Sequence, residues 1–108
     1  MARHYVLDEA GEVVGATSMS WALWFETHNR QIALDEPLPG VQVSTVFLGL
    51  DHQWDDSRPP LIYETMTFGY EGDGGWQLRY STREEALAGH ALVISALVNE
   101  LPRPQQER

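Results

Sequence analysis

Cysteine is missing from this chain of 108 residues, and lysine is missing too, so all seven basic residues are arginine. Without a thiol the chain can form no disulfide, no thiolate metal site and no cysteine nucleophile. Positive charge is scarce, because seven basic residues face sixteen acidic ones and leave a formal net charge of -9. Such a chain repels phosphate backbones and anionic lipid. We therefore expect a protein of a reducing cytoplasm that binds no DNA or RNA and no membrane.

Long apolar runs are missing as well. The N-terminus leads into only a few apolar residues before Asp8, which is too short for the core of a signal peptide. The stretch Ala86–Leu101 is interrupted by His90, Ser95 and Glu100. It is also shorter than the roughly 20 residues that cross a bilayer. The sequence therefore predicts no membrane-spanning segment.

Periodic patterns predict the secondary structure. Aromatic residues at helical spacing predict a helix from about Ser18 to Asn29 or Arg30. A capping-box pattern at Thr82 predicts a second helix, which ends near Leu101, before Pro102. Runs of β-branched and aromatic residues between turn signals predict five strands: Arg3–Leu7, Gln31–Leu34, Val41–Leu48, Leu61–Phe68 and Trp76–Tyr80.

The strand at Leu61–Phe68 has two unequal faces. Alternation places Glu64 with Ile62, Met66 and Phe68, on the more apolar face. The opposite face carries Tyr63, Thr65 and Thr67, which we expect to stand in water on a sheet with one covered side.

Together these elements predict an α+β fold, with an antiparallel sheet of about four to five strands and two amphipathic helices packed on one face. We expect a single domain over residues 1–101 and a polar C-terminal tail over residues 102–108 without a packing role. The four tryptophans exceed what a two-layer core of this size needs. A symmetric homodimer would bury that surplus and is the expected assembly.

The loop from Gly49 to Pro60 is rich in metal-ligand types. Asp51, His52, Asp55 and Asp56 offer oxygen and imidazole donors, and Glu64 follows on the next strand. A bound cation there would activate water, which makes a metal-dependent hydrolase one reading. The spacing matches no metal motif, however, and acidic loops are commonly solvated connections. We therefore expect no bound metal and no cofactor.

An acid–base pair is the second constellation. His52, Glu64 and His90 could supply a base and an orienting acid for proton transfer, but no activated hydroxyl accompanies them. The structural alternatives are a hydrogen-bonded His90 on a helix face and a Glu64 carboxylate paired with Arg30 or Arg79.

The third group of residues that could carry chemistry lies on the predicted aromatic helix from about Ser18 to Arg30. Trp24 beside Arg30 could stack a nucleobase while the guanidinium meets a phosphate. The alternative is that the aromatic stripe packs in the core or in a dimer interface.

Several segments resemble a family of small proteins encoded by bacteriophages and prophages. The resemblance runs in order through Trp21–Arg30, Val43–His52, Pro59–Gly69 and Tyr80–His90, and thus over most of the chain. The run VSTVFLGLDH is its most specific part. The chain departs from the pattern at Arg83, where the family often has tryptophan. It also departs at residues 55–58, where the loop of the family is richer in glycine than the loop of this chain.

The resemblance implies a context and not a reaction. It suggests a non-enzymatic accessory protein in the cytoplasm of the bacterial host, which engages a host protein or sequesters a small ligand, such as a nucleotide signal in anti-defence. Hydrolysis centred on Asp51, His52 and Glu64, or a structural place in the virion, are the alternatives. The residues expected to bind the ligand or partner are Trp24, Arg30, Asp51, His52, Trp54, Glu64 and His90.

Overall fold

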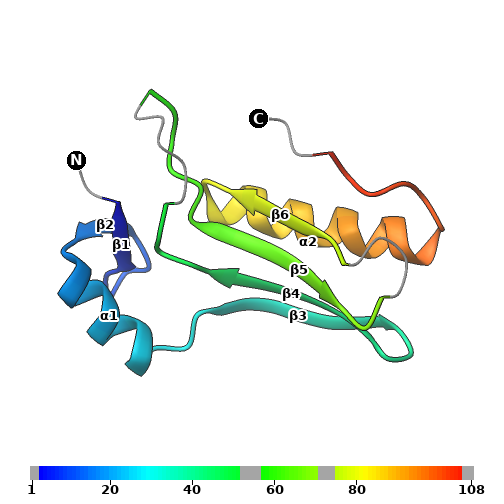
Figure 1. Ribbon diagram of the computed structural model, residues 1–108, viewed down its shortest axis with the longest axis horizontal. Coiled ribbons are helices and arrows are strands. Elements are labelled where there is room, and N and C mark those ends of the chain that lie inside the picture. Colours follow the sequence, from blue (N-terminus) through cyan, green and yellow to red (C-terminus); the bar gives the residue numbers. More distant parts are fainter. Residues whose placement is uncertain (1–2, 52–56, 71–74, 106–108) are drawn as a thin grey trace.

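The structure is a computed structural model that describes residues 3–51, 57–70 and 75–105. Within them, β1 (His4–Leu7) and β2 (Val13–Ala16) form an antiparallel hairpin. A four-stranded antiparallel sheet has the order β3-β4-β5-β6. Its strands are β3 (Gln31–Leu38), β4 (Val41–Phe47), β5 (Tyr63–Phe68) and β6 (Gln77–Tyr80), and the helices are α1 (Ser18–Thr27) and α2 (Arg83–Val98) (Figure 1). The expected α+β fold, with helices packed on an antiparallel sheet, is confirmed.

Both helices begin at side-chain caps. The Thr17 hydroxyl accepts the backbone N–H of Ser20 at the start of α1. At the start of α2 the Thr82 hydroxyl accepts the N–H of Glu85, whose carboxylate accepts the N–H of Thr82 in return. Such caps satisfy amides that the first helical turn leaves without partners, which explains why the helices start where the sequence predicts.

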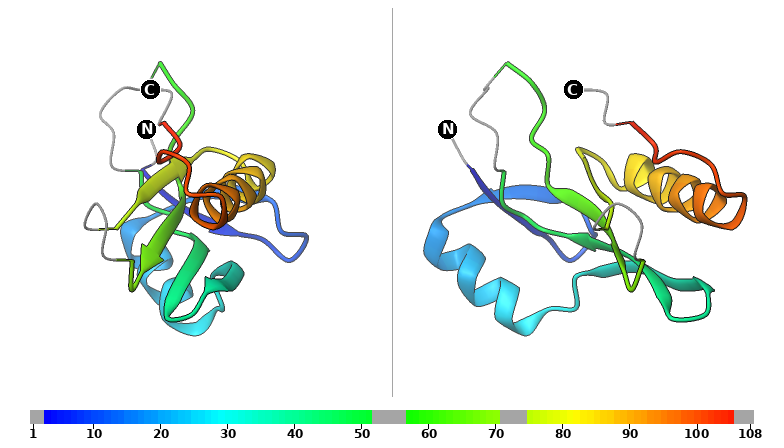
Figure 2. Two further views of the ribbon diagram at one scale, coloured as in Figure 1. Left: turned by 90° about the vertical axis from the view of Figure 1, so that its right-hand side faces the viewer. Right: turned by 45° about the vertical axis from the view of Figure 1, so that its right-hand side comes forward.

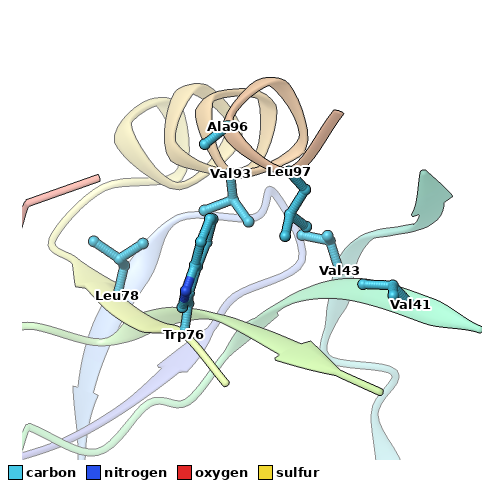
Figure 3. Packing of buried hydrophobic residues seen from close by; sticks show 7 residues of the cluster. All are labelled: Val41, Val43, Trp76, Leu78, Val93, Ala96 and Leu97. Atoms are coloured by element: carbon cyan, nitrogen blue, oxygen red, sulfur yellow. The ribbon is translucent and has the colours of Figure 1, made fainter. Parts of the chain in front are cut away.

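Helix α2 lies along one side of the four-stranded sheet, and its buried face fixes which sheet side chains are in the core (Figure 2). Strand pairing places Val43 opposite Thr67 and Thr45 opposite Thr65, all buried toward α2. Figure 3 shows the indole of Trp76 standing up from the sheet toward Val93 on the helix. The cluster comprises Val41, Val43, Trp76, Leu78, Val93, Ala96 and Leu97.

A second cluster joins the hairpin and α1 to the end of the main sheet. Phe47 is fully buried at its centre, and Ile62, Tyr63 and Ala86 pack around it. The ring of Trp24 meets the Phe47 ring edge-on, with 5.6 Å between their centroids. Helix α1 itself packs mainly on β1 and β2. Phe47 therefore links the two sheets.

Three details differ from the sequence-based expectation. The hairpin strand β2 was not expected, and β3 continues through Pro37 to Leu38. The face of β5 was assigned wrongly, because Tyr63, Thr65 and Thr67 are buried under α2. Buried threonines are tolerated there because their hydroxyls have hydrogen-bond partners, described below.

No helix in the described part of the chain is both long and apolar enough to cross a membrane.

Candidate functional site

The four-stranded sheet has one face that α2 does not cover. Strand pairing puts side chains from all four strands on this surface, which we call the open face. Its members are Gln31, Leu34, Glu36, Gln42, Ser44, Val46, Glu64, Met66, Phe68, Gln77 and Arg79.

An ion pair lies within the open face. The Glu64 side chain is buried, with the residue only 7% exposed. Its carboxylate accepts hydrogen bonds from Arg79 Nε at 3.0 Å and from Gln77 Nε2 at 2.5 Å. Because a buried carboxylate without partners is costly, Arg79 and Gln77 explain how Glu64 is tolerated here. Of the two arginines expected for this role, Arg79 is therefore the observed partner.

Apolar side chains on the open face remain exposed. Leu34 is 51% and Phe68 49% exposed, and Val46 and Met66 are half-buried between them and the ion pair. The amides of Gln31, Gln42 and Gln77 surround these groups. The charged side chains of the face are the Glu64–Arg79 pair and Glu36, which is exposed on the edge strand β3 two residues after Leu34.

A chain of hydrogen bonds lies under α2, on the other face of the sheet. Thr45 Oγ1 is 2.6 Å from Thr65 Oγ1 and 2.7 Å from His90 Nδ1. His90 Nε2 is 2.8 Å from the Asp35 carboxylate. A carboxylate only accepts, so Nε2 donates to Asp35, and each hydroxyl can then donate toward the imidazole. Every side chain in this series of hydrogen bonds therefore has a partner.

The order hydroxyl, imidazole, carboxylate is that of a catalytic triad, but its exposure is reversed. In a triad the hydroxyl must meet the substrate. Here Thr45 is 0% exposed, whereas the Asp35 side chain at the other end is 58% exposed. No substrate can reach this hydroxyl. The series of hydrogen bonds is a structural connection between β3, β4, β5 and α2.

Removing the Thr45 hydroxyl tests this role. Thr45→Val keeps the shape but leaves the Thr65 hydroxyl and His90 Nδ1 without their shared partner. We expect the free energy of unfolding to fall by about 1–3 kcal/mol in urea titrations. In a His90→Leu background the same substitution should cost clearly less. Equal costs in both backgrounds would contradict the coupling.

A cavity of about 270 Å³ lies between β6 and α2. Tyr80 and Leu78 line one wall, and Gly89 and Leu92 line another. Burial raises the pKa of Tyr80, and the neighbouring Thr65 hydroxyl partly offsets that rise. Pro104 of the expected tail also lines the cavity and is half-buried.

Trp24 and Arg30 stack on different rings. The Arg30 guanidinium carbon lies 3.5 Å from the centroid of the Phe25 ring. The Trp24 indole stacks on His28 with 4.7 Å between ring centroids. A hollow of about 570 Å³ beside Trp24 is also lined by Asp8 and Glu9, which disfavour a phosphate.

Of the loop residues expected at the site, Asp51 is the one that lies within the described part of the chain. Asp51 accepts the backbone N–H of Leu61 at 3.3 Å and anchors the loop to the start of β5. His52 and Trp54 lie outside the described residues, as do Asp55 and Asp56. The described residues contain no group of three or more carboxylate or imidazole ligands that could hold a metal.

The expected site residues therefore do not all converge. Glu64 and His90 occupy opposite faces of the sheet, because Glu64 follows the alternation opposite to Thr65. Asp35 was missed because it is 55 residues from His90 in the sequence. Leu34 and Phe68 were missed as well, and a correct assignment of the β5 face would have identified Phe68.

Comparison with known proteins finds no family model, no curated protein and no solved structure that matches this chain.

Proposed function

We propose that this chain is a non-enzymatic binding protein that presents the open face of its four-stranded sheet to a protein partner. The observation that carries the proposal is an uncovered sheet surface on which Leu34 and Phe68 are about half exposed, beyond Val46 and Met66 on the same side of the Glu64–Arg79 pair. Exposed apolar groups rimmed by polar ones are typical of protein interaction sites.

Charge indicates the chemistry of the partner. The Glu64 carboxylate is paired within the face, and the exposed Glu36 lies at the edge strand, so the centre of the face offers no unpaired carboxylate to a strongly basic surface. Its exposed groups are apolar side chains within a ring of amides and the Ser44 hydroxyl. We therefore expect a partner with an apolar centre and backbone or side-chain amides at its edge.

Burial argues against an enzyme at the strongest catalytic candidate. The Thr45 hydroxyl is inaccessible, and His90 and Glu64 point to different faces. Acid–base catalysis needs both groups within hydrogen-bond reach of one substrate. Binding therefore accounts for the exposed chemistry better than hydrolysis does.

The resemblance to phage and prophage proteins supplies the biological setting of the proposal. In that setting the partner is a protein of the bacterial host cytoplasm, and occupation of its surface is the activity. A nucleotide ligand has less support, because Trp24 stacks on His28 beside the acidic Asp8 and Glu9.

Sequestration of a smaller ligand is a second candidate, favoured by the cavity at Tyr80. Its volume of about 270 Å³ is just below the range of about 300–1,000 Å³ usual for drug-sized ligands. A thermal-shift screen of small aromatic and aliphatic compounds would test it. A raised melting temperature that disappears in Leu92→Trp, which fills the cavity, would support this site.

Site-specific photo-cross-linking tests the open face. A photoreactive phenylalanine analogue is placed at Phe68, and separately at Leu23, which is 61% exposed on α1 and serves as the control. In bacterial cells we expect a discrete adduct with a second protein from position 68 and none from position 23. Adducts equally strong from both positions, or an adduct of twice the mass of this chain, would contradict the proposal.

A further inference from the structure

The chain changes direction sharply where α2 ends. Glu100 has a φ of 55°, in the left-handed region that disfavours side chains. The Glu100 N–H donates to the Leu97 carbonyl at 3.4 Å, and the Leu101 N–H donates to the Ala96 carbonyl at 2.8 Å. These two hydrogen bonds form a Schellman motif, which satisfies the last carbonyls of a helix at such a turn. Beyond the turn the chain runs back beside α2 (Figure 1).

Residues 101–105, which we call the strap, reach the cavity between β6 and α2. Pro104 and Gln105 form part of the cavity wall. Pro104 is half-buried, whereas the other residues of the strap are exposed. Proline has no N–H, so it can lie against apolar side chains without burying a donor that lacks a partner. The strap therefore supplies one wall of the cavity and contacts the rest of the fold there mainly through Pro104.

The other walls of the cavity are apolar, and the charges among them already have partners. The apolar residues that line it are Leu61, Leu78, Tyr80, Ala88, Gly89 and Leu92. Arg79 donates to the Glu64 carboxylate on the open face. The Glu85 carboxylate accepts the N–H groups of Ser81 and Thr82 at the start of α2. An ionic ligand would have to compete with these contacts, whereas an uncharged one would not.

We propose that this cavity binds an uncharged, mainly apolar molecule and that the strap closes over it. This assignment rests on the second candidate function, in which the cavity is a ligand site, and adds the class of ligand and the element that closes. A molecule that contacts both Leu92 and Pro104 binds more tightly when the strap is seated than when it is released. Binding therefore holds the strap in place, and the seated strap slows escape of the molecule.

Thiol cross-linking tests the seat of the strap without any ligand. The chain has no cysteine, so Gln105→Cys can be paired with Ala88→Cys, at the cavity, or with Leu87→Cys, which does not line it. With a short bis-maleimide we expect the pair with position 88 to react at least about fivefold faster, because the seated strap holds the two thiols close together. A free tail would reach both neighbouring positions equally. Equal rates would therefore overturn the seat of the strap.

Position 100 provides a matched pair of variants for the turn. Proline fixes φ at about −65°, so Glu100→Pro should release the strap and remove the difference in rate between positions 87 and 88. Glycine adopts a positive φ readily, so Glu100→Gly should keep the difference. Position 100 lies beyond the end of α2, so both variants should fold as judged by circular dichroism. A preference for position 88 that survives Glu100→Pro would contradict the role of the turn.

Thermal unfolding with matched neutral and charged compounds tests the class of ligand. We expect indole and naphthalene to raise the melting temperature, and their anionic counterparts indole-3-acetate and 1-naphthoate to raise it clearly less. In Glu100→Pro the shift from the neutral compounds should fall by at least about half. An equal or larger shift in Glu100→Pro would overturn closure by the strap but keep the cavity as a ligand site. If neither neutral compound shifts the wild type, the ligand site itself is overturned.

Discussion

Replacing Phe47 by alanine should lower the free energy of unfolding by about 3–5 kcal/mol, as expected for deleting a fully buried aromatic side chain. Phe47 is 0% exposed, and its ring meets Trp24 and Tyr63 with centroid separations of 5.6 Å and 5.1 Å. The surrounding residues come from both sheets and from α1, so they cannot all move in to fill the space. Chemical denaturation followed by tryptophan fluorescence measures the loss.

Phe68→Ala is the matched control for this prediction. Phe68 is also a phenylalanine on the same sheet, but it lies on the open face and is 49% exposed. Its removal should cost less than about 1 kcal/mol. Similar losses for the two variants would mean that Phe47 is not the residue linking the two parts of the fold.

Gly49→Ala should be nearly as damaging, with a cost of about 2–5 kcal/mol from backbone strain and crowding together. Gly49 has a φ of 68°, in the left-handed region that disfavours side chains. A Cβ there would also collide with the Tyr5 carbonyl oxygen and lie 2.7 Å from Trp21 Nε1. The Gly49 carbonyl accepts the Tyr5 N–H, so this close approach holds β1 against the end of β4.

Gly11→Ala separates the two causes. Gly11 has a similar φ of 82°, but nothing lies within 4 Å of the position a Cβ would take. Its replacement should cost only the backbone strain, about 1–2 kcal/mol. Thermal unfolding of both variants therefore measures the crowding at Gly49 by difference. If the two glycines cost the same, the hairpin does not depend on close packing at Gly49.

Local patterns in the sequence predict most of the secondary structure. The capping box at Thr82 and the β-branched run from Val41 both lead to elements that begin within one residue of the expected position. The strand Val13–Ala16 escaped because a short run of two valines, a glycine and an alanine carries little alternation. The strand His4–Leu7 and the turn at Asp8–Glu12 that follows it were the features that could have indicated a returning strand, because His4–Leu7 pairs with Val13–Ala16.

The faces of β5 could not be assigned by counting apolar residues. Thr65 and Thr67 have apolar methyl groups, and their hydroxyls are satisfied by Thr45 and by the backbone N–H of Trp76. Phe68 looks like a core residue in the sequence but lies on the open face. The decisive information is long-range pairing, which a strand pattern does not contain.

The candidate site was predictable in part for the same reason. Arg79 could be named as a possible partner of Glu64 because the two residues lie on strands that follow each other in the sequence. In the structure they are opposite each other on β5 and β6. The link from His90 to Asp35 joins α2 to the far edge strand and leaves no local trace in the sequence. Only such long-range contacts show whether a histidine has a structural or a catalytic role.

Titration of the partner identified by cross-linking at position 68 tests the central claim most directly. Calorimetry compares the purified wild-type chain with Phe68→Glu on the open face and Leu23→Glu on α1, both folded by circular dichroism. Binding through the open face predicts at least about a hundredfold loss of affinity for Phe68→Glu, since a charge is then buried in an apolar contact, and no change for Leu23→Glu. Unchanged affinity of the Phe68→Glu variant would contradict the claim.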